Sequence, residues 1–230
     1  MSFNLNILAF RATDNHELRE QYHKGLEQIL LHYGVSKVTS QSKDWFDDPD
    51  TWLVVVVSED TKQVLGGARL QMAKQGMPLP MENAVGYKDS KVYDIVKDYR
   101  EKGGVSELCG LWNSRKVAGM GLGSVFLGRA CVALSPFANM KTVLALCAPS
   151  TKENCFRIGF ELLDRLGTAG EFNYPKENLV ATSVVIEDVE NLPYCKEIDR
   201  NKIFELRNNT NLATKEDTPR GEIFIQYKLL

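Results

Sequence analysis

Hydrophobic positions recur at two spacings along this chain of 230 residues, one typical of helices and one typical of strands. Asn6 to Phe10 reads as a first strand, and the stretch after it has a helical period. The apolar positions of that helix are Leu18, Tyr22, Leu26, Ile29, Leu30 and Tyr33. Asp14 and Glu17 predict its N-terminal cap, and Gly34 predicts its end.

Two apolar runs then predict a β-hairpin. Trp52 to Val57 and Gln63 to Leu70 resemble strands, and a polar turn joins them. The part from Val54 to Val57 has no polar position, which predicts a strand covered on both faces. The segment from residue 72 to residue 104 reads as an insertion with a short helix from Ser90 to Arg100, and we expect it to shape an acceptor pocket.

The C-terminal part of the chain predicts two further strands, Asn178 to Glu187 and Glu222 to Lys228. Ile203 to Arg207 predicts a short helix between them. Asn208 to Arg220 is polar throughout, and we expect it to form a mobile loop.

The centre of the chain alternates strands and helices around a glycine-rich turn. The strand Glu107 to Trp112 precedes the turn Gly119-Met120-Gly121-Leu122-Gly123, and the helical run Ser124 to Ala130 follows at once. A second strand from Thr142 to Leu146 and a second helix from Thr151 complete the unit. Glycines let backbone amides crowd together, and the free amides and dipole of a helix N-terminus attract phosphate groups. This order therefore predicts a phosphate-binding turn.

Two common nucleotide motifs do not fit this turn. A dinucleotide fingerprint needs a different glycine spacing and an acidic residue about 20 positions later, but no Asp or Glu lies between Leu108 and Lys152. A nucleoside-triphosphate loop needs Gly-Lys-Ser/Thr, which is absent. Arg115, Lys116 and Arg129 leave the segment positively charged and suited to an anionic ligand. The alternative is a tight turn that only joins the strand to the helix.

The turn resembles the signature of the GNAT superfamily of N-acyltransferases, Gln/Arg-x-x-Gly-x-Gly/Ala at the start of a helix. Gly121-Leu122-Gly123-Ser124 matches its second half, and Ala118 stands at its first position. The resemblance implies that Gly119, Met120, Gly121, Leu122, Gly123 and Ser124 bind the phosphates of an acyl carrier. Arg157-Ile158-Gly159-Phe160 is similar to the superfamily's Tyr-x-x-x-Gly-Phe ending. In that register Cys155 occupies the position of the tyrosine that protonates the departing thiolate, and a buried structural cysteine is the alternative.

Three upstream segments resemble acyl-homoserine-lactone synthases, also called autoinducer synthases. Ser42 to Leu53 is similar to their Glu-x-Asp-x-Tyr-Asp segment, and Val64 to Leu70 is similar to their Gly-x-x-Arg-Leu strand. Glu107 to Leu111 stands where that family has Glu-x-Ser-Arg-Phe, with Gly110 in the place of the arginine. With the glycine turn, these partial matches cover about half of the chain, roughly residues 44 to 160.

Carboxylates have a chemical reason to be in such a site, because an attacking amine must lose a proton. Glu107 is the candidate base. Asp44 and Asp47 are candidates to orient the ammonium group of an amino-acid-like acceptor, and Arg69 to pair with its carboxylate or with an acidic partner. A solvated acidic loop and an ordinary cross-strand ion pair are the alternatives. A backbone amide between Leu111 and Asn113 is a candidate to hold the developing oxyanion.

Composition adds limits on the class of protein. Hydrophobic residues make up 43% and charged residues 25% of the chain, values typical of one folded domain over residues 1–230 with the insertion at about 72–104. The net charge of −2 gives no reason to expect nucleic acid as a partner. The five cysteines contain no Cys-x-x-Cys pair, so we expect no metal. No signal peptide or membrane span is recognisable, which predicts a cytoplasmic protein.

These observations predict an α/β fold of the GNAT type, with a mixed, mainly antiparallel sheet flanked by helices and splayed central strands. The predicted activity is transfer of an acyl group from acyl-CoA or acyl carrier protein to a primary amine of a small acceptor. A catalytically silent module that binds acyl-CoA, and an autoinducer-type lactone synthase that depends on S-adenosylmethionine, remain as alternatives. The sequence leaves acyl length, acceptor identity and oligomeric state open.

Overall fold

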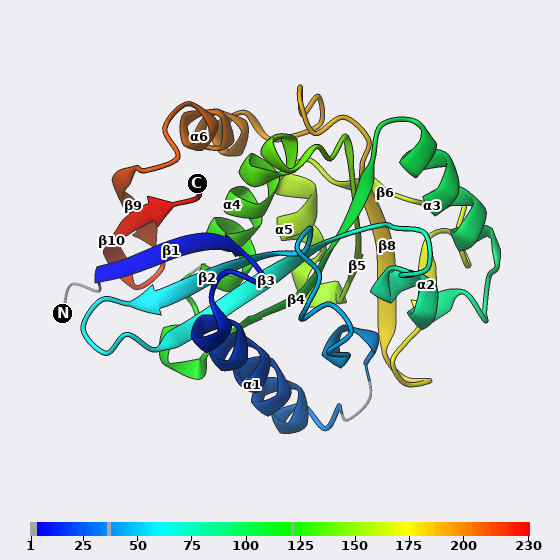
Figure 1. Ribbon diagram of the computed structural model, residues 1–230, viewed down its shortest axis with the longest axis horizontal. Helices are drawn as coiled ribbons and strands as arrows, with labels where there is room; N and C mark the ends of the chain where they lie inside the picture. The colour runs from blue at the N-terminus through cyan, green and yellow to red at the C-terminus, as the bar shows by residue number, and fades with distance from the viewer. Residues whose placement is uncertain (1–3, 36–37, 121) are drawn as a thin grey trace.

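The predicted strands form one mixed sheet, which runs through the whole molecule (Figure 1). The computed structural model describes residues 4–35, 38–120 and 122–230. Within these residues the sheet has ten strands in the order β6-β8-β5-β4-β3-β2-β1-β10-β9, and β7 also pairs with β8. The strands are β1 (Asn4–Arg11), β2 (Trp52–Ser58), β3 (Val64–Met72), β4 (Val105–Asn113), β5 (Thr142–Cys147), β6 (Glu161–Leu162), β7 (Glu171–Asn173), β8 (Val180–Ile186), β9 (Ala213–Thr218) and β10 (Gly221–Lys228).

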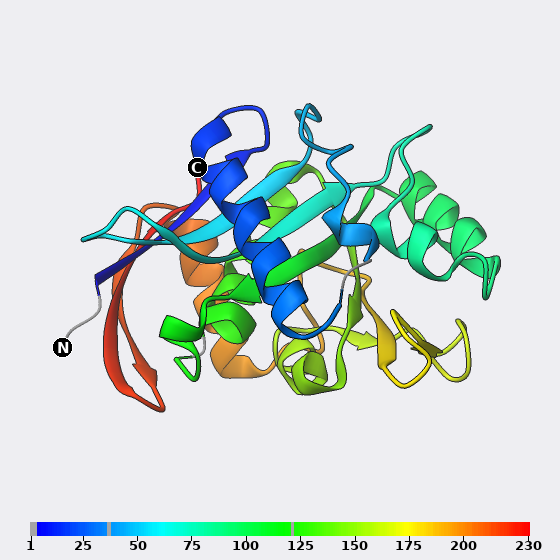
Figure 2. The ribbon, with the colours of Figure 1, turned by 90° about the horizontal axis from the view of Figure 1, so that it is seen from below.

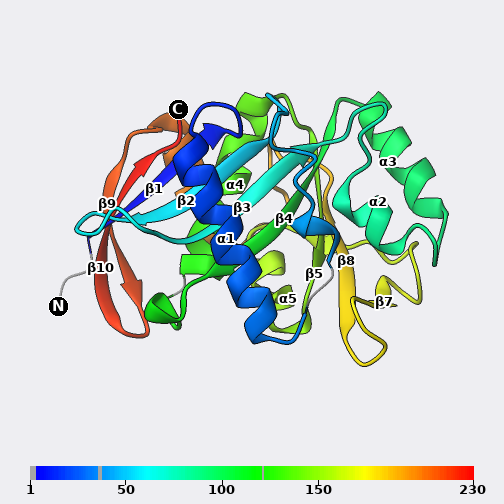
Figure 3. The same cartoon turned by 60° about the horizontal axis from the view of Figure 1, so that its bottom comes forward.

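Helices cover both faces of this sheet. They are α1 (His16–His32), α2 (Pro80–Val85), α3 (Lys91–Glu101), α4 (Leu127–Leu134), α5 (Pro149–Arg157) and α6 (Glu197–Asn208), with short 3-10 turns η1 (Thr39–Gln41), η2 (Arg115–Val117) and η4 (Ser135–Ala138). A π-helix, η3 (Leu122–Phe126), runs directly into α4. Figure 3 shows α1 lying across β2 to β4, with α4 and α5 behind the sheet. The insertion carries α2 and α3 at the end of the molecule opposite the β9–β10 hairpin (Figure 1).

Strand pairing confirms the predicted fold class. The pairs β1–β10 and β4–β5 are parallel, and the other pairs are antiparallel. The predicted hairpin is the antiparallel pair β2–β3. Val54, Val55 and Val56 are fully buried, as the unbroken apolar run predicted. Each buried valine side chain stabilises the fold by about 1.5–3 kcal/mol relative to an exposed one.

Two local predictions were wrong. The N-cap of α1 is Asn15, whose side chain accepts a hydrogen bond from the Leu18 amide at 3.0 Å. Asp14 instead accepts one from the Arg11 amide at 3.2 Å and closes the preceding turn. The predicted loop from Asn208 to Arg220 contains β9, which pairs with β10. β9 lies at the edge of the sheet, and its residues are mostly polar. No apolar pattern therefore marked this segment as a strand.

The end of α1 agrees with the sequence, since Gly34 follows the helix with a φ of +66°. The predicted helix near Ile203 is longer than expected and forms α6. Among the described residues, no helix combines the length and apolarity that crossing a bilayer requires.

Candidate active site

The central parallel strands β4 and β5 part from each other halfway along their length. They pair at only three positions, Val105 with Thr142, Ser106 with Val143, and Glu107 with Leu144. Beyond Glu107, β4 continues to Asn113 and β5 to Cys147, with no pairing between them in the described register. The splayed central strands of the predicted fold are therefore present.

A β-bulge in β4 accompanies this divergence. Gly67 pairs with Trp112 and Arg69 pairs with Cys109, so two residues of β4 face one residue of β3. The first of the two is Gly110, with a φ of +58°, a conformation that favours glycine. The local requirement for a glycine accounts for Gly110 at the position where the lactone synthases have arginine.

Tyr22 of α1 fixes this bulge from one face of the sheet. Its hydroxyl donates a hydrogen bond to the carbonyl of Gly110 at 2.8 Å. A Cβ atom on Gly110 would lie 2.3 Å from the same hydroxyl oxygen, so a side chain would collide with Tyr22. The helical spacing of apolar positions predicted that Tyr22 is buried, but its contact with β4 joins residues too far apart for a local pattern to show.

The backbone beyond the bulge faces the gap at alternate residues. The Ser114 amide donates to the carbonyl of Leu65 in β3 at 2.6 Å, so the polar backbone groups of Ser114 point toward β3. Backbone groups alternate along a regular strand, and those of Asn113 therefore point away from β3, toward the open side of β4. The region predicted to hold an oxyanion lies along the gap, and its role remains a prediction.

A cavity of about 560 Å³ lies in the gap. On one side of the sheet its wall includes Leu26 and Leu30 of α1, and on the other side Gly128 of α4 and Ile158 after α5. Further parts of the wall come from β4, β5, η1, α2, α5, the segment between β7 and β8, and the start of β8. The wall is mostly apolar, so the cavity suits a hydrophobic chain that passes through the sheet.

Glu107 stands where the strands part, and it lines this cavity. Its side chain is 3% exposed, and its Oε2 accepts a hydrogen bond from the Met81 amide at 2.6 Å. Burial raises the pKa of Glu107 from 4.5 to about 8, against the opposing effects of this hydrogen bond and of the Arg69 charge. The carboxyl group is thereby tuned to exchange a proton near neutral pH.

Arg69 lies on the same face of the sheet and is fully buried. One guanidinium nitrogen donates to the carbonyl of Ser40 at 3.2 Å, and the group lies 4.5 Å above the ring of Trp45. Its Nε has no hydrogen-bond partner among the described residues. The alternative for Arg69, an ordinary cross-strand ion pair, is not among the salt bridges of the described residues. The guanidinium charge is therefore available to an anion.

A second cavity of about 210 Å³ brings Asp44 and Arg69 together. It shares Thr39 and Pro80 with the larger cavity, so the two cavities adjoin. Asp44 is exposed and accepts a hydrogen bond from the Ser42 hydroxyl at 2.5 Å. The cavity has a carboxylate and a buried guanidinium in its wall, the two charges that complement an amino acid.

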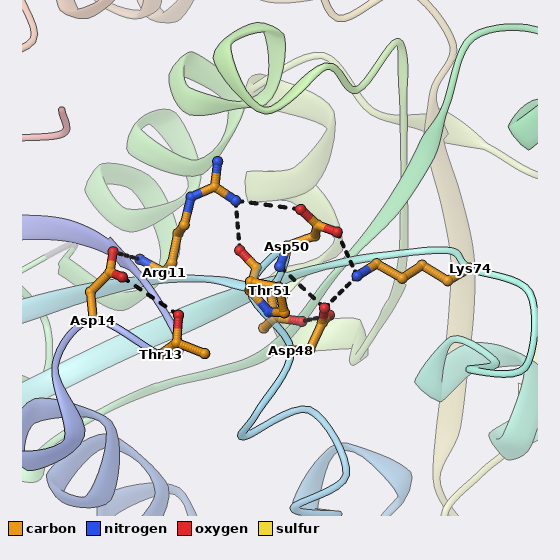
Figure 4. A network of polar contacts seen from close by, with 8 residues as sticks. Arg11, Thr13, Asp14, Asp48, Asp50, Thr51 and Lys74 are labelled. Carbon is orange, nitrogen blue, oxygen red and sulfur yellow. Dashed lines mark hydrogen bonds and ion pairs between the residues drawn. The ribbon is translucent and has the colours of Figure 1, made fainter.

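Asp47 is exposed and lines neither cavity, whereas its neighbour Asp48 is buried. Asp48 accepts hydrogen bonds from Lys74 and from Thr51, and Lys74 also pairs with Asp50 (Figure 4). Burial alone would raise the pKa of Asp48, but the bonds from Lys74 and Thr51 lower it below its usual value. The contacts of Asp48 anchor the loop that carries Asp44, and the side chain of Asp47 is exposed to solvent.

Cys155 lines the large cavity beside Cys147. A hydrogen bond with Cys147, together with burial, raises the pKa of the Cys155 thiol, and the same bond lowers the pKa of Cys147. A role of Cys155 as proton donor to the departing thiolate stays a prediction. The raised pKa, however, makes Cys155 a weaker acid than an ordinary thiol, which favours the packing alternative.

The glycine turn follows β4 and leads into the helical run that begins at Leu122. Gly119 has a φ of +77° and is exposed, whereas the side chains of Met120 and Leu122 are buried. Gly121 lies outside the described residues, and so do the surroundings of Gly123 and Ser124. Phosphate binding at the turn remains a prediction.

Arg129 does not contribute to the expected positive environment of the turn. Its guanidinium lies 2.7 Å from Asp199 and 3.2 Å from Glu216, and all three side chains are buried. Both partners lie far away in sequence, so the pattern around the turn gave no sign of this ion pair. Among the described residues, no group of three His, Cys, Asp or Glu side chains is placed to hold a metal.

The fold is therefore a sheet that opens between two central parallel strands, beside a turn that leads into a helix. Three solved structures share it. FeeM, an N-acyl amino acid synthase from uncultured soil microbes, matches with a TM-score of 0.62 and 10% identity over 85% of this chain and 97% of its own. A CoA-dependent acyl-homoserine lactone synthase, BjaI, with SAM and isopentyl-CoA, gives 0.50 and 16% over 86% and 89%. A protein designated a phosphinothricin N-acetyltransferase gives 0.51 and 12% over 78% and 96%.

At these identities the comparison establishes the fold, and the predicted resemblance is confirmed at that level. No protein-family model matches the sequence, and no curated protein matches it.

Proposed function

We propose that this protein transfers an acyl group from a pantetheine thioester to the primary amine of a small acceptor. The observation that carries the proposal is the apolar cavity through the β4–β5 gap, with the buried carboxyl of Glu107 where the strands part. The names of the three similar structures, two synthases of N-acyl compounds and an N-acetyltransferase, support the same class of reaction. Coenzyme A and acyl carrier protein both present a pantetheine arm, and both are donors within this proposal.

In the proposed reaction the neutral amine attacks the thioester carbonyl, a carbon–nitrogen bond forms, and the carbon–sulfur bond then breaks. Glu107 accepts the proton that the amine nitrogen loses, and this proton is then delivered to the departing thiolate, so the products are an amide and the free carrier thiol and Glu107 is again a carboxylate. Backbone amides of Leu111 and Asn113 are the candidates to stabilise the oxyanion. Direct attack needs no covalent enzyme intermediate.

For the acceptor we propose an amino-acid-like molecule in the smaller cavity. Its carboxylate would pair with the free edge of the Arg69 guanidinium, and its ammonium group would face Asp44. Asp47 lines neither cavity, so any influence of Asp47 on the acceptor would act through long-range charge.

The test combines several acyl-CoA chain lengths with a panel of amines, including amino acids and S-adenosylmethionine, and measures free thiol. Wild-type protein should turn over, and Glu107→Gln should lose about a hundredfold in kcat. Glu101→Gln is the matched control, since Glu101 is exposed at the end of α3. Binding of acyl-CoA without turnover of any amine would favour the silent module. Turnover only with S-adenosylmethionine would favour the lactone synthase.

A further inference from the structure

Gln71 of β3 lies between the proposed base and the proposed acceptor cavity. In the antiparallel register of β3 and β4 it pairs directly with Glu107, so the two side chains share a face of the sheet and their Cβ atoms are about 4.5–5.5 Å apart. Arg69 lies two residues earlier on β3 and therefore on the same face. In Figure 2 the cyan strand β3 runs beside the green strand β4 and leads toward α2 and α3. Gln71 is thus the neighbour of both charged groups.

The two cavities divide these three residues. Glu107 lines the larger, apolar cavity, whereas Arg69 and Gln71 line the smaller one. Thr39 and Pro80 belong to both walls, so the cavities adjoin beside them. The proposed acceptor has its carboxylate on Arg69, and its amine is attached to the carbon next to that carboxylate. An amine that attacks a thioester beside Glu107 must therefore lie close to the side chain of Gln71.

The carboxamide of Gln71 is buried and keeps one hydrogen-bond acceptor open. The residue is 5% exposed. Its Nε2 donates a long hydrogen bond of 3.5 Å to the carbonyl of Pro78, which turns the oxygen of the same group away from Pro78. That oxygen accepts no hydrogen bond from the part of the chain that the structure describes. A polar group this deeply buried normally has a partner, so the open acceptor favours a ligand that donates a hydrogen bond.

We propose that the carbonyl oxygen of Gln71 accepts a hydrogen bond from the attacking amine and makes the protein select primary over secondary amines. The inference rests on the proposed acyl transfer. A neutral primary amine has two N–H bonds. When its lone pair attacks the thioester carbonyl, one proton passes to Glu107, and the other hydrogen stays on the nitrogen and is bonded to Gln71. A secondary amine has a single N–H, which Glu107 must take, so no donor remains for Gln71.

A neutral carboxamide suits this place better than a carboxylate would. The charged side chains that already act on Glu107 are Arg69 and Glu82, and Asp44 is exposed, so solvent screens its charge. A further negative charge directly beside Glu107 would raise the pKa of Glu107 and of the amine, and would keep the amine protonated and unreactive. Gln71→Glu should therefore move the rise of kcat/KM with pH upward by about one pH unit or more.

The experiment compares kcat/KM for an accepted amino acid and for its N-methyl derivative, which has one N–H fewer. Gln71→Met keeps the length of the side chain and removes the carboxamide. The wild type should prefer the primary amine, and in Gln71→Met that preference should fall about tenfold, the worth of one hydrogen bond in a buried site. Gln71→Asn, with its carbonyl one methylene further back, should lie between the two. Gln63→Met is the matched control, since Gln63 is exposed just before β3, and should leave the preference unchanged.

A purely structural role of Gln71 would slow both acceptors equally. An unchanged ratio in Gln71→Met would therefore overturn the inference and leave the proposed function standing. Denaturant titration checks that Gln71→Met is folded, and the ratio in Gln71→Asn decides the question if it is not.

If no amine supports turnover, the proposed function fails, and calorimetry with the same amino acids decides the inference. Binding that weakens at least about fivefold in Gln71→Met would then support it. Equal binding by both proteins, or no binding of any amino acid by the wild type, would overturn it.

Discussion

The raised pKa of Glu107 predicts how the stability of the protein responds to pH. A carboxyl with a raised pKa in the folded state binds its proton more tightly there than in the unfolded chain. Its contribution to stability is fully present below the unfolded pKa of 4.5 and is lost as pH rises to the folded value of about 8. At about 1.36 kcal/mol for each unit of pKa, the total loss is about 5 kcal/mol as an upper bound.

Glu107→Gln isolates this contribution. Glutamine has nearly the same shape, it can still accept the hydrogen bond from the Met81 amide, and it carries no charge at any pH. The free energy of unfolding of both proteins should be measured by denaturant titration between about pH 5 and about pH 9. Trp45, Trp52 and Trp112 are buried and report unfolding by fluorescence.

The quantity of interest is the difference between the two proteins, because all other titrating groups cancel. We expect the wild type to lose stability relative to Glu107→Gln by about 1.4 kcal/mol per pH unit until about pH 8, and the difference to level off above it. Glu101→Gln should give a flat difference. If the Glu107→Gln difference is also flat, Glu107 is not held in an environment that raises its pKa, and its assignment as the base loses its physical ground.

Three further predictions concern the surroundings of the site. Gly110→Ala should destabilise the protein by about 2–4 kcal/mol through its positive φ and the collision with the Tyr22 hydroxyl, and Tyr22→Phe should recover part of that loss in a double-mutant cycle. Lys74→Met should lower the free energy of unfolding by about 1–3 kcal/mol at about pH 7 and by less at about pH 3. The pKa of Asp48 is lower in the folded protein than in the unfolded chain, so its stabilising effect is complete above the unfolded pKa and is lost as pH falls through the folded pKa. Denaturant titration at both pH values measures this difference. Cys155→Ala should keep kcat within about threefold, and a hundredfold loss would establish Cys155 as the proton donor.

The elements around the site were predictable where the signal is local. The valine run of β2, the helical period of α1 and the strand–turn–helix order after β4 each depend on neighbours within a few positions. Glu107 was selected because it lies on the strand that precedes the glycine turn, where the lactone synthases have Glu-x-Ser-Arg-Phe. Such patterns select a candidate residue and leave its environment undetermined.

The features of the site that could not be predicted depend on contacts between residues far apart in the sequence. In the sequence, Gly110 stands where the lactone synthases have an arginine. In the structure it forms a β-bulge that is held by Tyr22, 88 positions away. Asp47 and Asp48 are adjacent in the sequence, and Asp48 is the buried one, held by Thr51 and by Lys74, which lies 26 positions away. The ion pairs of Arg129 with Asp199 and Glu216 are 70 and 87 positions apart, beyond any local pattern.

The opening of the sheet also gives a physical reason for proposing Glu107 as the base. An ordinary carboxyl is too acidic to take a proton readily from an ammonium-forming nitrogen, and proton transfer is most effective when the two pKa values are close. The partner strand ends its pairing at Glu107, and an apolar cavity takes its place beyond that residue. In the proposed reaction the thioester enters this cavity, and burial of Glu107 raises its pKa toward that of an amine. Substrate access and basicity therefore share one structural cause, so a variant that fills the gap beside Glu107 without changing the glutamate should alter both.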